Sequence, residues 1–168
     1  MSVRVYSVWC LPQASDETRF DLAIEELAAR SGGPVFQPHL TLGTFSAPAS
    51  LAGLSDQAFS LEPQALDGTP IFTTSLFVRF GQTDVLSRAR AALESRKAFR
   101  PGRDFDPHIS LHYGPPPAGA RQVEVLQDLL RQSVLFDRLA LIEMKVPIED
   151  HSAIATWRTI DLLSLTDA

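Results

Sequence analysis

Residues 3–11 are mostly hydrophobic, and a period of two places Tyr6, Val8 and Cys10 on one face and Val5, Ser7 and Trp9 on the other. A period of two predicts a β-strand, which Pro12 ends. The period then lengthens to three or four positions, at Phe20, Ala23, Ile24, Leu27 and Ala28. This pattern predicts an amphipathic helix of about four turns that begins near Ser15 and ends at Gly32-Gly33.

A strand followed by a helix occurs again in the second half. Residues 70–80 are rich in β-branched and aromatic side chains, which predicts a strand, and residues 60–66 are a second candidate. Asp67-Gly68 predicts a hairpin turn between them. Asp84 is the expected cap of a helix that ends near Lys97, with an apolar face of Leu86, Ala89 and Leu93. Between the halves, residues 48–57 are expected to form one short helix.

The C-terminal third begins with a proline-rich loop at residues 115–119. A helix is expected next, from the spacing of Val123, Leu126, Leu129 and Leu130. Strands are predicted at 136–146 and 156–163, with a polar loop at 147–153 between them. The order of elements indicates one α+β domain over residues 1–168, with an internal pseudo-repeat and two sheets facing each other across a groove.

One motif occurs twice: Phe36-Gln37-Pro38-His39-Leu40-Thr41-Leu42 returns as Phe105-Asp106-Pro107-His108-Ile109-Ser110-Leu111. Each copy is expected on a strand, the first over residues 35–45. Side chains on a strand alternate faces, so His39 and Thr41 would share one face, with leucines behind them. The second copy would present His108 and Ser110 in the same way. The sequence therefore predicts two equivalent arms of one site.

Two imidazoles and two hydroxyls meet the demands of opening a cyclic phosphodiester. Water must lose a proton as it attacks phosphorus, and the departing alkoxide must gain one. A histidine has an ordinary pKa of about 6.5, so His39 and His108 can serve as base and acid near neutral pH. Thr41 and Ser110 can donate hydrogen bonds to the phosphoryl oxygens. This chemistry needs no metal and no cofactor, and the sequence leaves open which histidine is the base.

Several other readings of the histidines stay open. The repeat can be an old duplication whose histidines only hydrogen-bond within the fold. His112 has the same strand parity as His108, so it can be a third catalytic residue, or it can bind zinc together with His39 and His108. His151, in the polar loop, is expected to be solvated.

Aromatic and cationic residues on strands are further candidates for contact with a ligand. Tyr113, at the end of the second motif strand, either lines the groove or packs in the core. Trp9, Phe72, Phe77 and Trp157 are candidates for stacking a base, with core packing as the alternative for each. Arg4, Arg79, Lys145 and Arg158 are cations that can offset the charge of a phosphate if they face the groove.

Composition narrows the classes of partner. The net charge is −5 and the pI is about 5.3, which argues against a large grip on duplex nucleic acid. Cys10 is the only cysteine, so no internal disulfide can form, and the cytosol is the expected compartment. We expect no signal peptide. Residues 31–55 lack charged side chains but contain prolines and polar residues, so we expect no membrane span.

The paired motifs His39-Leu40-Thr41 and His108-Ile109-Ser110 resemble the signature of the two-histidine phosphoesterase superfamily. The chain looks most like the cyclic phosphodiesterase branch known from plants. The other stretches that carry this resemblance are Tyr6-Ser7-Val8-Trp9, Leu11-Pro12, Pro107-His108-Ile109-Ser110-Leu111 with Tyr113, Arg138-Leu139-Ala140-Leu141 and Thr156-Trp157. The resemblance spans nearly the whole chain and is weaker from Ala47 to Ala65.

The resemblance implies a two-lobed fold, each lobe an antiparallel sheet with helices outside, and a groove between the lobes. It implies metal-independent hydrolysis of ADP-ribose 1″,2″-cyclic phosphate to the 1″-phosphate and of nucleoside 2′,3′-cyclic phosphates to 2′-phosphates. His39 and His108 would be acid and base, Thr41 and Ser110 would bind phosphate, and Tyr113 would lie near the ligand. Trp9, as an aromatic candidate, is also expected to bind the substrate. The expected protein is a monomer.

Two features depart from that family pattern. With Cys10 alone, the chain cannot form the disulfides that plant relatives use for regulation, so no redox control is expected. His112 stands where an aliphatic residue is expected, which would alter pH dependence or substrate choice.

Two other functions remain as alternatives. An RNA 2′,3′-cyclic phosphodiesterase with 2′-5′ RNA ligase-like activity would act on RNA ends, although the net charge of −5 tells against it. A binding protein would capture a cyclic phosphate or a nucleotide without turnover.

Overall fold

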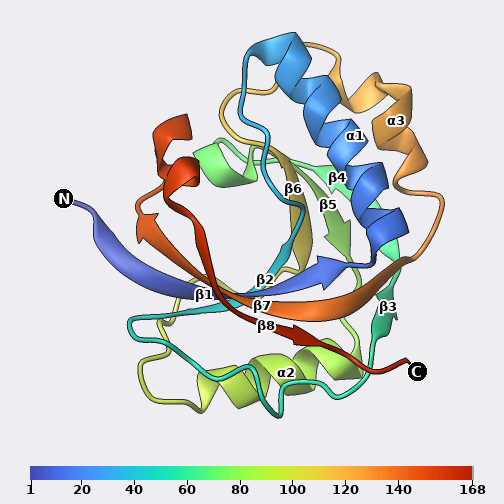
Figure 1. Cartoon of the computed structure of the whole chain (residues 1–168). Helices are drawn as coiled ribbons and strands as arrows, with labels where there is room; N and C mark the ends of the chain where they lie inside the picture. The colour runs from blue at the N-terminus through green and yellow to red at the C-terminus, as the bar shows by residue number, and fades with distance from the viewer. Residues whose placement is uncertain (168) are drawn as a thin grey trace.

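A computed structural model describes residues 1–167 of the protein (Figure 1). The strands are β1 (Val3–Pro12), β2 (Leu40–Phe45), β3 (Phe59–Leu61), β4 (Pro63–Asp67), β5 (Leu76–Phe80), β6 (His108–His112), β7 (Val134–Val146) and β8 (Arg158–Ser164). The α-helices are α1 (Ala14–Ser31), α2 (Asp84–Glu94) and α3 (Glu124–Asp128). Three short 3-10 helices complete the structure, at η1 (Phe72–Thr74), η2 (Ala120–Gln122) and η3 (His151–Thr156).

All eight strands belong to one antiparallel sheet, in the order β3-β7-β1-β2-β6-β5-β4, with β8 also paired to β7. β3 pairs with the start of β7, and β8 pairs with the middle of the same strand. The two motif strands, β2 and β6, are neighbours, and their register consists of the single pair Leu40 and Ile109. This narrow junction divides the sheet into two lobes, so the predicted α+β fold with two antiparallel lobes is confirmed.

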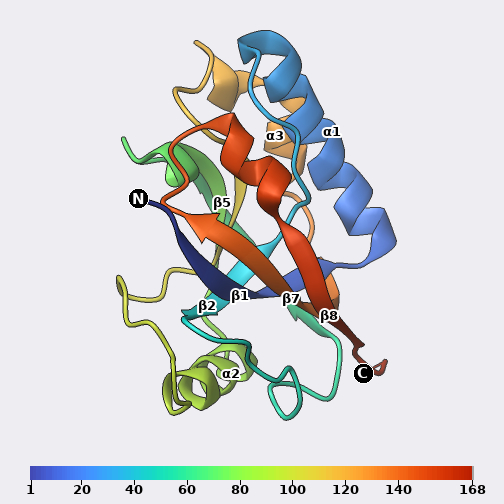
Figure 2. The same ribbon diagram turned by 60° about the vertical axis from the view of Figure 1, so that its left-hand side comes forward.

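The helices lie outside the curved sheet, with α1 and α3 together at one end and α2 at the other (Figures 1 and 2). Each long helix packs on the motif strand of the opposite copy: α1 contacts β6, and α2 contacts β2. The exchange ties the two lobes together on the side of the sheet that faces away from the motif histidines.

Helical spacing in the sequence matches the buried faces of α1 and α2. The five residues expected on the apolar face of α1 are all buried there, and Gly32 ends the helix in the left-handed region at φ 71°, donating its N–H to the carbonyl of Ala28. In α2 the cap is Thr83 rather than Asp84: the Thr83 hydroxyl accepts from the N–H of Leu86. The helix ends at Glu94, short of Lys97.

The strand predicted at 70–80 is wrong in its first half. Residues 72–74 form η1, and the strand β5 begins only at Leu76. Asp67-Gly68 is therefore not a two-residue hairpin, because a longer connection joins β4 to β5. The Thr69 hydroxyl donates to the Thr74 carbonyl across this connection, at 3.0 Å. The carbonyl of Thr74 is thus bonded within the connection instead of to a neighbouring strand.

Other boundaries also differ from the expectations. The first motif strand starts at Leu40 rather than near residue 35, because Pro34 and Pro38 have no N–H to donate to a sheet. Residues 48–57 form an irregular loop with one turn instead of a helix. The helix expected around 123–130 is shorter, and the loop expected at 147–153 ends in η3, so the last strand begins at Arg158.

Both motif strands carry a bulge at the same point of the repeat. Along β1 and β2 the partners change from Val8 and Gly43 to Trp9 and Thr41, which skips Leu42. Along β5 and β6 they change from Leu76 and His112 to Phe77 and Ser110, which skips Leu111. A bulge breaks the alternation of faces. The residues beyond it therefore face opposite to what strict alternation predicts.

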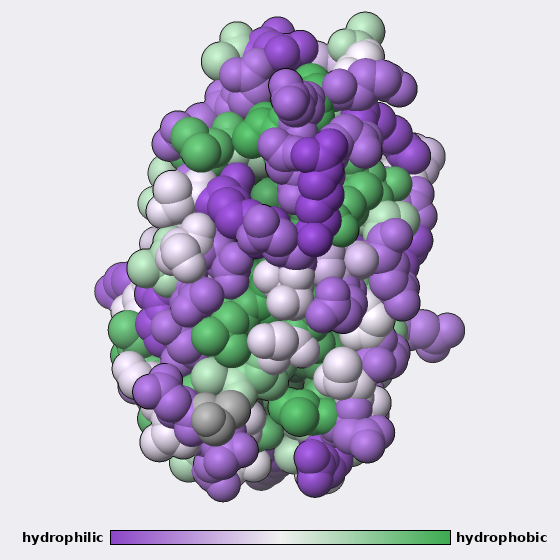
Figure 3. Space-filling view, turned by 90° about the vertical axis from the view of Figure 1, so that its right-hand side faces the viewer, coloured by the Kyte–Doolittle hydropathy of each residue, from purple (hydrophilic) through white to green (hydrophobic). Residues whose placement is uncertain are grey.

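The face of the molecule on the side of α1 and α3 is mixed in polarity (Figure 3). Figure 3 views the side of the molecule on which α1 and α3 lie in Figure 1, and there hydrophobic residues form separate patches among hydrophilic ones. No helix within residues 1–167 is long and apolar enough to cross a membrane.

Candidate active site

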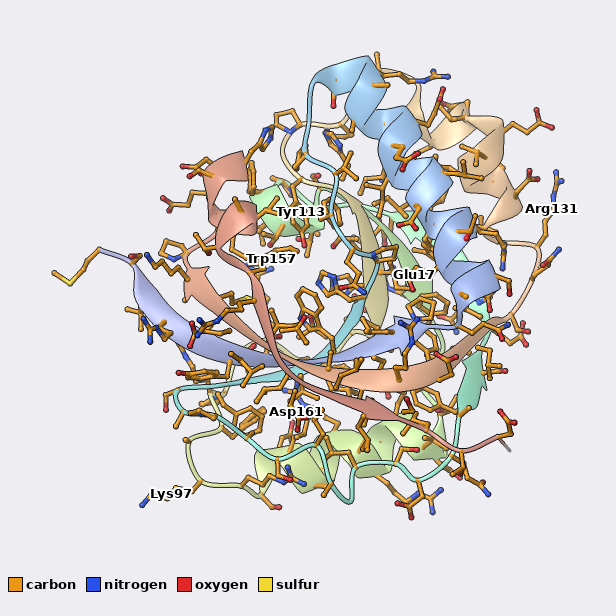
Figure 4. The ribbon with its side chains drawn as sticks, in the orientation of Figure 1. Glu17, Lys97, Tyr113, Arg131, Trp157 and Asp161 are labelled. Carbon is orange, nitrogen blue, oxygen red and sulfur yellow. The ribbon has the colours of Figure 1, made fainter. Side chains whose placement is uncertain are left out.

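Both copies of the motif open onto one cavity of about 480 Å³ on the face of the sheet opposite α1 and α2. All six residues singled out as catalytic or substrate-binding line it: His39, Thr41, His108, Ser110, Tyr113 and Trp9. The remaining lining residues are Ser7, Thr44, Ile71, Thr73, Thr74, Arg103, Met144, Val146, Ile148 and Trp157. In Figure 4 Tyr113 and Trp157 lie inside the curve of the sheet, whereas Lys97 lies at the periphery.

The two histidines are held by the same hydrogen bond. Nδ1 of His39 lies 2.7 Å from the carbonyl oxygen of Gln37, and Nδ1 of His108 lies 2.7 Å from that of Asp106. A carbonyl oxygen can only accept, so Nδ1 carries the hydrogen in both rings. In each neutral ring Nε2 therefore carries a lone pair, which can accept a proton and later release it.

The surroundings of the two rings differ. His39 is 8% exposed and stacks on Trp9, with ring centroids 3.5 Å apart and an interplanar angle of 11°. The edge of Trp157 closes the ring from the side. Burial lowers the pKa of His39 to about 4, the charge of His108 acts in the same direction, and the bond to Gln37 opposes them. His108 is less buried, and the tilted ring of Phe77 lies 4.8 Å from its ring.

The two motif hydroxyls are not equivalent either. Ser110 donates to the carbonyl oxygen of Thr73 at 2.8 Å. Thr41 makes no side-chain hydrogen bond within residues 1–167, and it sits half-buried in the cavity wall. Thr41 thus has its donor free for a ligand, whereas Ser110 must turn away from Thr73 to offer its own.

The two aromatic candidates differ in what remains accessible. One face of Trp9 is covered by His39, its edge meets Trp157, and its Nε1 donates to the Ser7 hydroxyl at 3.0 Å. Trp9 therefore supports His39 and offers no free face to a base. Tyr113 is 4% exposed and stacks on Phe36, and burial raises the pKa of its phenol. It lines the cavity and also packs in the core.

His112 lies away from this cavity, contrary to its strand parity. The bulge at Leu111 turns His112 toward the end of α1, where its Nε2 lies 3.4 Å from the Ser31 hydroxyl. Burial lowers the pKa of His112. The same bulge turns Tyr113 into the cavity, and the bulge at Leu42 does so for Thr44. The set of His39, His108 and His112 thus does not converge on a metal site.

No group of three or more His, Cys, Asp or Glu residues in the described chain, residues 1–167, is arranged to hold a metal ion. The fourth histidine, His151, is exposed, with its ring 6.0 Å from that of Phe72.

The strand-borne cations do not reach the cavity. Arg4 and Arg158 pair with Glu143, and Lys145 is exposed. Arg79 binds Asp67 and Asp106. The cation that does line the cavity is Arg103, in the loop before β6, which sequence reasoning missed. Thr44, which also lines the cavity, was missed as well. The sequence holds a signal for each residue: Arg103 follows several basic residues just ahead of the second motif, and Thr44 is the repeat equivalent of Tyr113.

Known proteins resemble the chain over nearly its whole length. A cyclic phosphodiesterase of Arabidopsis thaliana is 26% identical over 180 residues, covering 96% of this chain and 95% of that protein. The crystal structure of E. coli LigT complexed with 3′-AMP has a TM-score of 0.54 at 18% identity and covers 97% of this chain and 98% of LigT. A crystal structure of a phosphoesterase has a TM-score of 0.54 at 15% identity, with 98% and 99% covered. No family model matches the sequence.

Proposed function

We propose that the chain is a two-histidine phosphoesterase that hydrolyses cyclic phosphodiesters, with His39 and His108 as its proton-transfer groups. One observation carries the proposal: two imidazoles with identical Nδ1 anchors present their free Nε2 atoms to a single cavity. In-line displacement at phosphorus needs one such group beside the attacking oxygen and one beside the leaving oxygen.

His39 is the proposed base. Its buried ring is neutral at neutral pH, because burial lowers its pKa to about 4. Nε2 of His39 takes a proton from water as the water oxygen bonds to phosphorus. The ring P–O bond breaks and its electron pair goes to the departing alkoxide. His108 enters this step as the imidazolium, donates its Nε2 proton to the alkoxide and is left as the neutral Nδ1–H tautomer. Exchange of one proton with solvent at each ring restores the starting state.

The charge that builds up on the non-bridging oxygens needs donors. The free hydroxyl of Thr41 is the first, and Ser110 becomes a second when it releases the Thr73 carbonyl. Arg103 adds a positive charge at the cavity wall. Met144, Val146 and Ile148 give the cavity an apolar side, suited to the nucleoside part of a substrate.

The proposed substrates are ADP-ribose 1″,2″-cyclic phosphate, giving the 1″-phosphate, and nucleoside 2′,3′-cyclic phosphates, giving 2′-phosphates. The similarity to a plant cyclic phosphodiesterase supports the class of substrate, a cyclic phosphodiester. Because the chemistry uses only side chains of this chain, we propose that it requires no metal or cofactor. We also propose that the enzyme acts as a monomer and works in the cytoplasm.

A second candidate is an RNA 2′,3′-cyclic phosphodiesterase with 2′-5′ RNA ligase-like activity. The observation in its favour is a neighbouring cavity of about 370 Å³, which shares Arg103 with the first and adds Phe99 and Phe105. That space would admit a nucleotide next to the cyclic end. An RNA with a terminal 2′,3′-cyclic phosphate should then react with a higher kcat/KM than the mononucleotide, with a steep salt dependence.

The test is turnover of adenosine 2′,3′-cyclic phosphate and ADP-ribose 1″,2″-cyclic phosphate in EDTA, with products identified by phosphorus NMR. Wild type should form the 2′- and 1″-phosphates, and H39A and H108A should not. H151A, at an exposed histidine outside the cavity, is the matched control and should retain activity. Activity lost to EDTA would refute the mechanism. Thermal stabilisation by the substrates without turnover would instead indicate a binding protein.

A further inference from the structure

The two catalytic histidines share an anchor but differ in what holds the anchor in place. The Nδ1 of His39 bonds to Gln37, an exposed neutral residue, while the ring itself is fixed between Trp9 and Trp157. His108 is less buried and lacks such a stack. Its anchor is the carbonyl of Asp106, where the repeat places a carboxylate in the position of Gln37.

Arg79 of β5 holds that carboxylate through its guanidinium fork. Nε of Arg79 lies 2.9 Å from Oδ1 of Asp106, and its Nη2 lies 3.0 Å from Oδ2. The remaining nitrogen, Nη1, donates to Asp67 of β4. These hydrogen bonds, those to Asp106 first, raise the pKa of Arg79. A guanidinium bound to two carboxylates on different segments has little freedom to move, so Asp106 is fixed to the sheet.

A second set of contacts links Arg79 to the same imidazole. Arg79 and His108 are register partners on β5 and β6. The guanidinium carbon of Arg79 lies 5.3 Å from the centre of the Phe77 ring, and that ring is 4.8 Å from the His108 ring. Arg79 thus supports the histidine through the anchoring backbone and through the neighbouring aromatic ring.

We propose that Arg79 is a positioning residue for His108: its clamp on Asp106 fixes the carbonyl that orients the imidazole and selects its Nδ1–H tautomer. The proposal rests on the function proposed above, since it assigns the clamp to the proton-donating histidine. It also explains an asymmetry of the repeat. Packing orients the buried histidine, and an ion pair orients the more exposed one.

The test compares R79M, R79K and D106N with R121M. Arg121 lies 3.9 Å from Asp67 in the same charged group but does not contact Asp106, so R121M is the matched control. The first readout is the tautomer of each histidine, from the ¹⁵N shifts of both ring nitrogens correlated with the carbon-bound ring protons. In R79M and D106N, His108 should shift toward a mixture of tautomers, while His39 stays Nδ1–H. R121M should leave both rings unchanged.

The second readout is kinetic. R79M should lower kcat about tenfold with KM within a factor of about two, because the substrate contacts remain and only the acid is misplaced. R79K, which keeps the charge but not the fork, should fall between R79M and wild type. The double variant R79M/D106N should be no worse than either single variant, since both remove one clamp.

An unchanged His108 tautomer in folded R79M would overturn the proposal, whatever happens to the rate. Equal losses in R79M and R121M would also overturn it, because they would indicate a general effect of charge. The NMR readout needs no substrate. Wild-type protein that turns over neither cyclic phosphate would therefore refute the proposed function while the tautomers still decide the role of Arg79.

Discussion

Leu40 of β2 and Ile109 of β6 are direct partners in the sheet, and they occupy the same position in the two copies of the motif. An antiparallel pair of equivalent residues marks a pseudo-two-fold axis. Because the strands are antiparallel, Thr41 lies opposite His108 on one side of this pair. His39 lies opposite Ser110 on the other side. The antiparallel order therefore sets each histidine opposite the hydroxyl residue of the other copy, so that an imidazole and a hydroxyl flank the pair on each side.

This symmetry predicts that both histidines are needed for each turnover. H39A and H108A should each lower kcat by roughly 10²–10⁴-fold, the usual contribution of one proton-transfer group. The double variant should be little worse than either single one, because the two residues act in one concerted step. Rates with adenosine 2′,3′-cyclic phosphate test this. A residual rate near that of wild type in either variant would contradict the pairing.

The second prediction concerns pH and stability. The pKa of His39 is about 4 in the folded protein, against an ordinary value of 6.5 when unfolded. Between these values the unfolded chain binds more protons than the folded one, so stability is complete above pH 6.5 and is lost as the pH falls toward 4. The loss should reach about 3 kcal/mol. Urea unfolding of wild type and H39Q from pH 4 to 7 measures it, and parallel curves would refute it.

The same burial predicts the effect of removing Trp9. W9A opens the stacked face of His39 to water, so the pKa of His39 should rise toward 6.5. The acid limb of kcat/KM, where the base becomes protonated, should then move from near pH 4 to higher pH. Rates measured from pH 4 to 8 check this. An unmoved limb would mean that another group is the base.

The repeat made it predictable that His39 and His108 share one cavity, because two copies of one motif at equal spacing can be recognised without knowledge of the fold. The bulges at Leu42 and Leu111 were not predictable, since leucine has no preference for a bulge. The bulge at Leu111 reversed the expected direction of His112. Arg103 was missed for a related reason: it lies in a loop, where no period fixes the direction of a side chain. The strand expected at 70–80 failed in its first half because Thr74 bonds to Thr69 across the connection from β4 instead of pairing with a neighbouring strand.

The fourth prediction separates the two motif hydroxyls. T41V should lower kcat/KM with little change in stability, because the Thr41 hydroxyl bonds to nothing within residues 1–167. S110A should lower both kcat/KM and the free energy of unfolding. It also removes the hydrogen-bond donor to the Thr73 carbonyl, which costs about 1 kcal/mol of stability. Thermal unfolding and steady-state kinetics on both variants test the difference. Equal losses of stability would show that the two hydroxyls play the same part.

The last prediction concerns Arg103. It is the cation of the cavity wall, so R103M should weaken binding of the anionic substrate and lower kcat/KM about tenfold. R100M is the matched control, because Arg100 is an exposed arginine of the same segment that does not line the cavity. Added salt should slow wild type more than R103M, since screening acts on the charge that the variant lacks. If the two variants behave alike, the contribution comes from the basic segment as a whole, and Arg103 has no contact of its own with the phosphate.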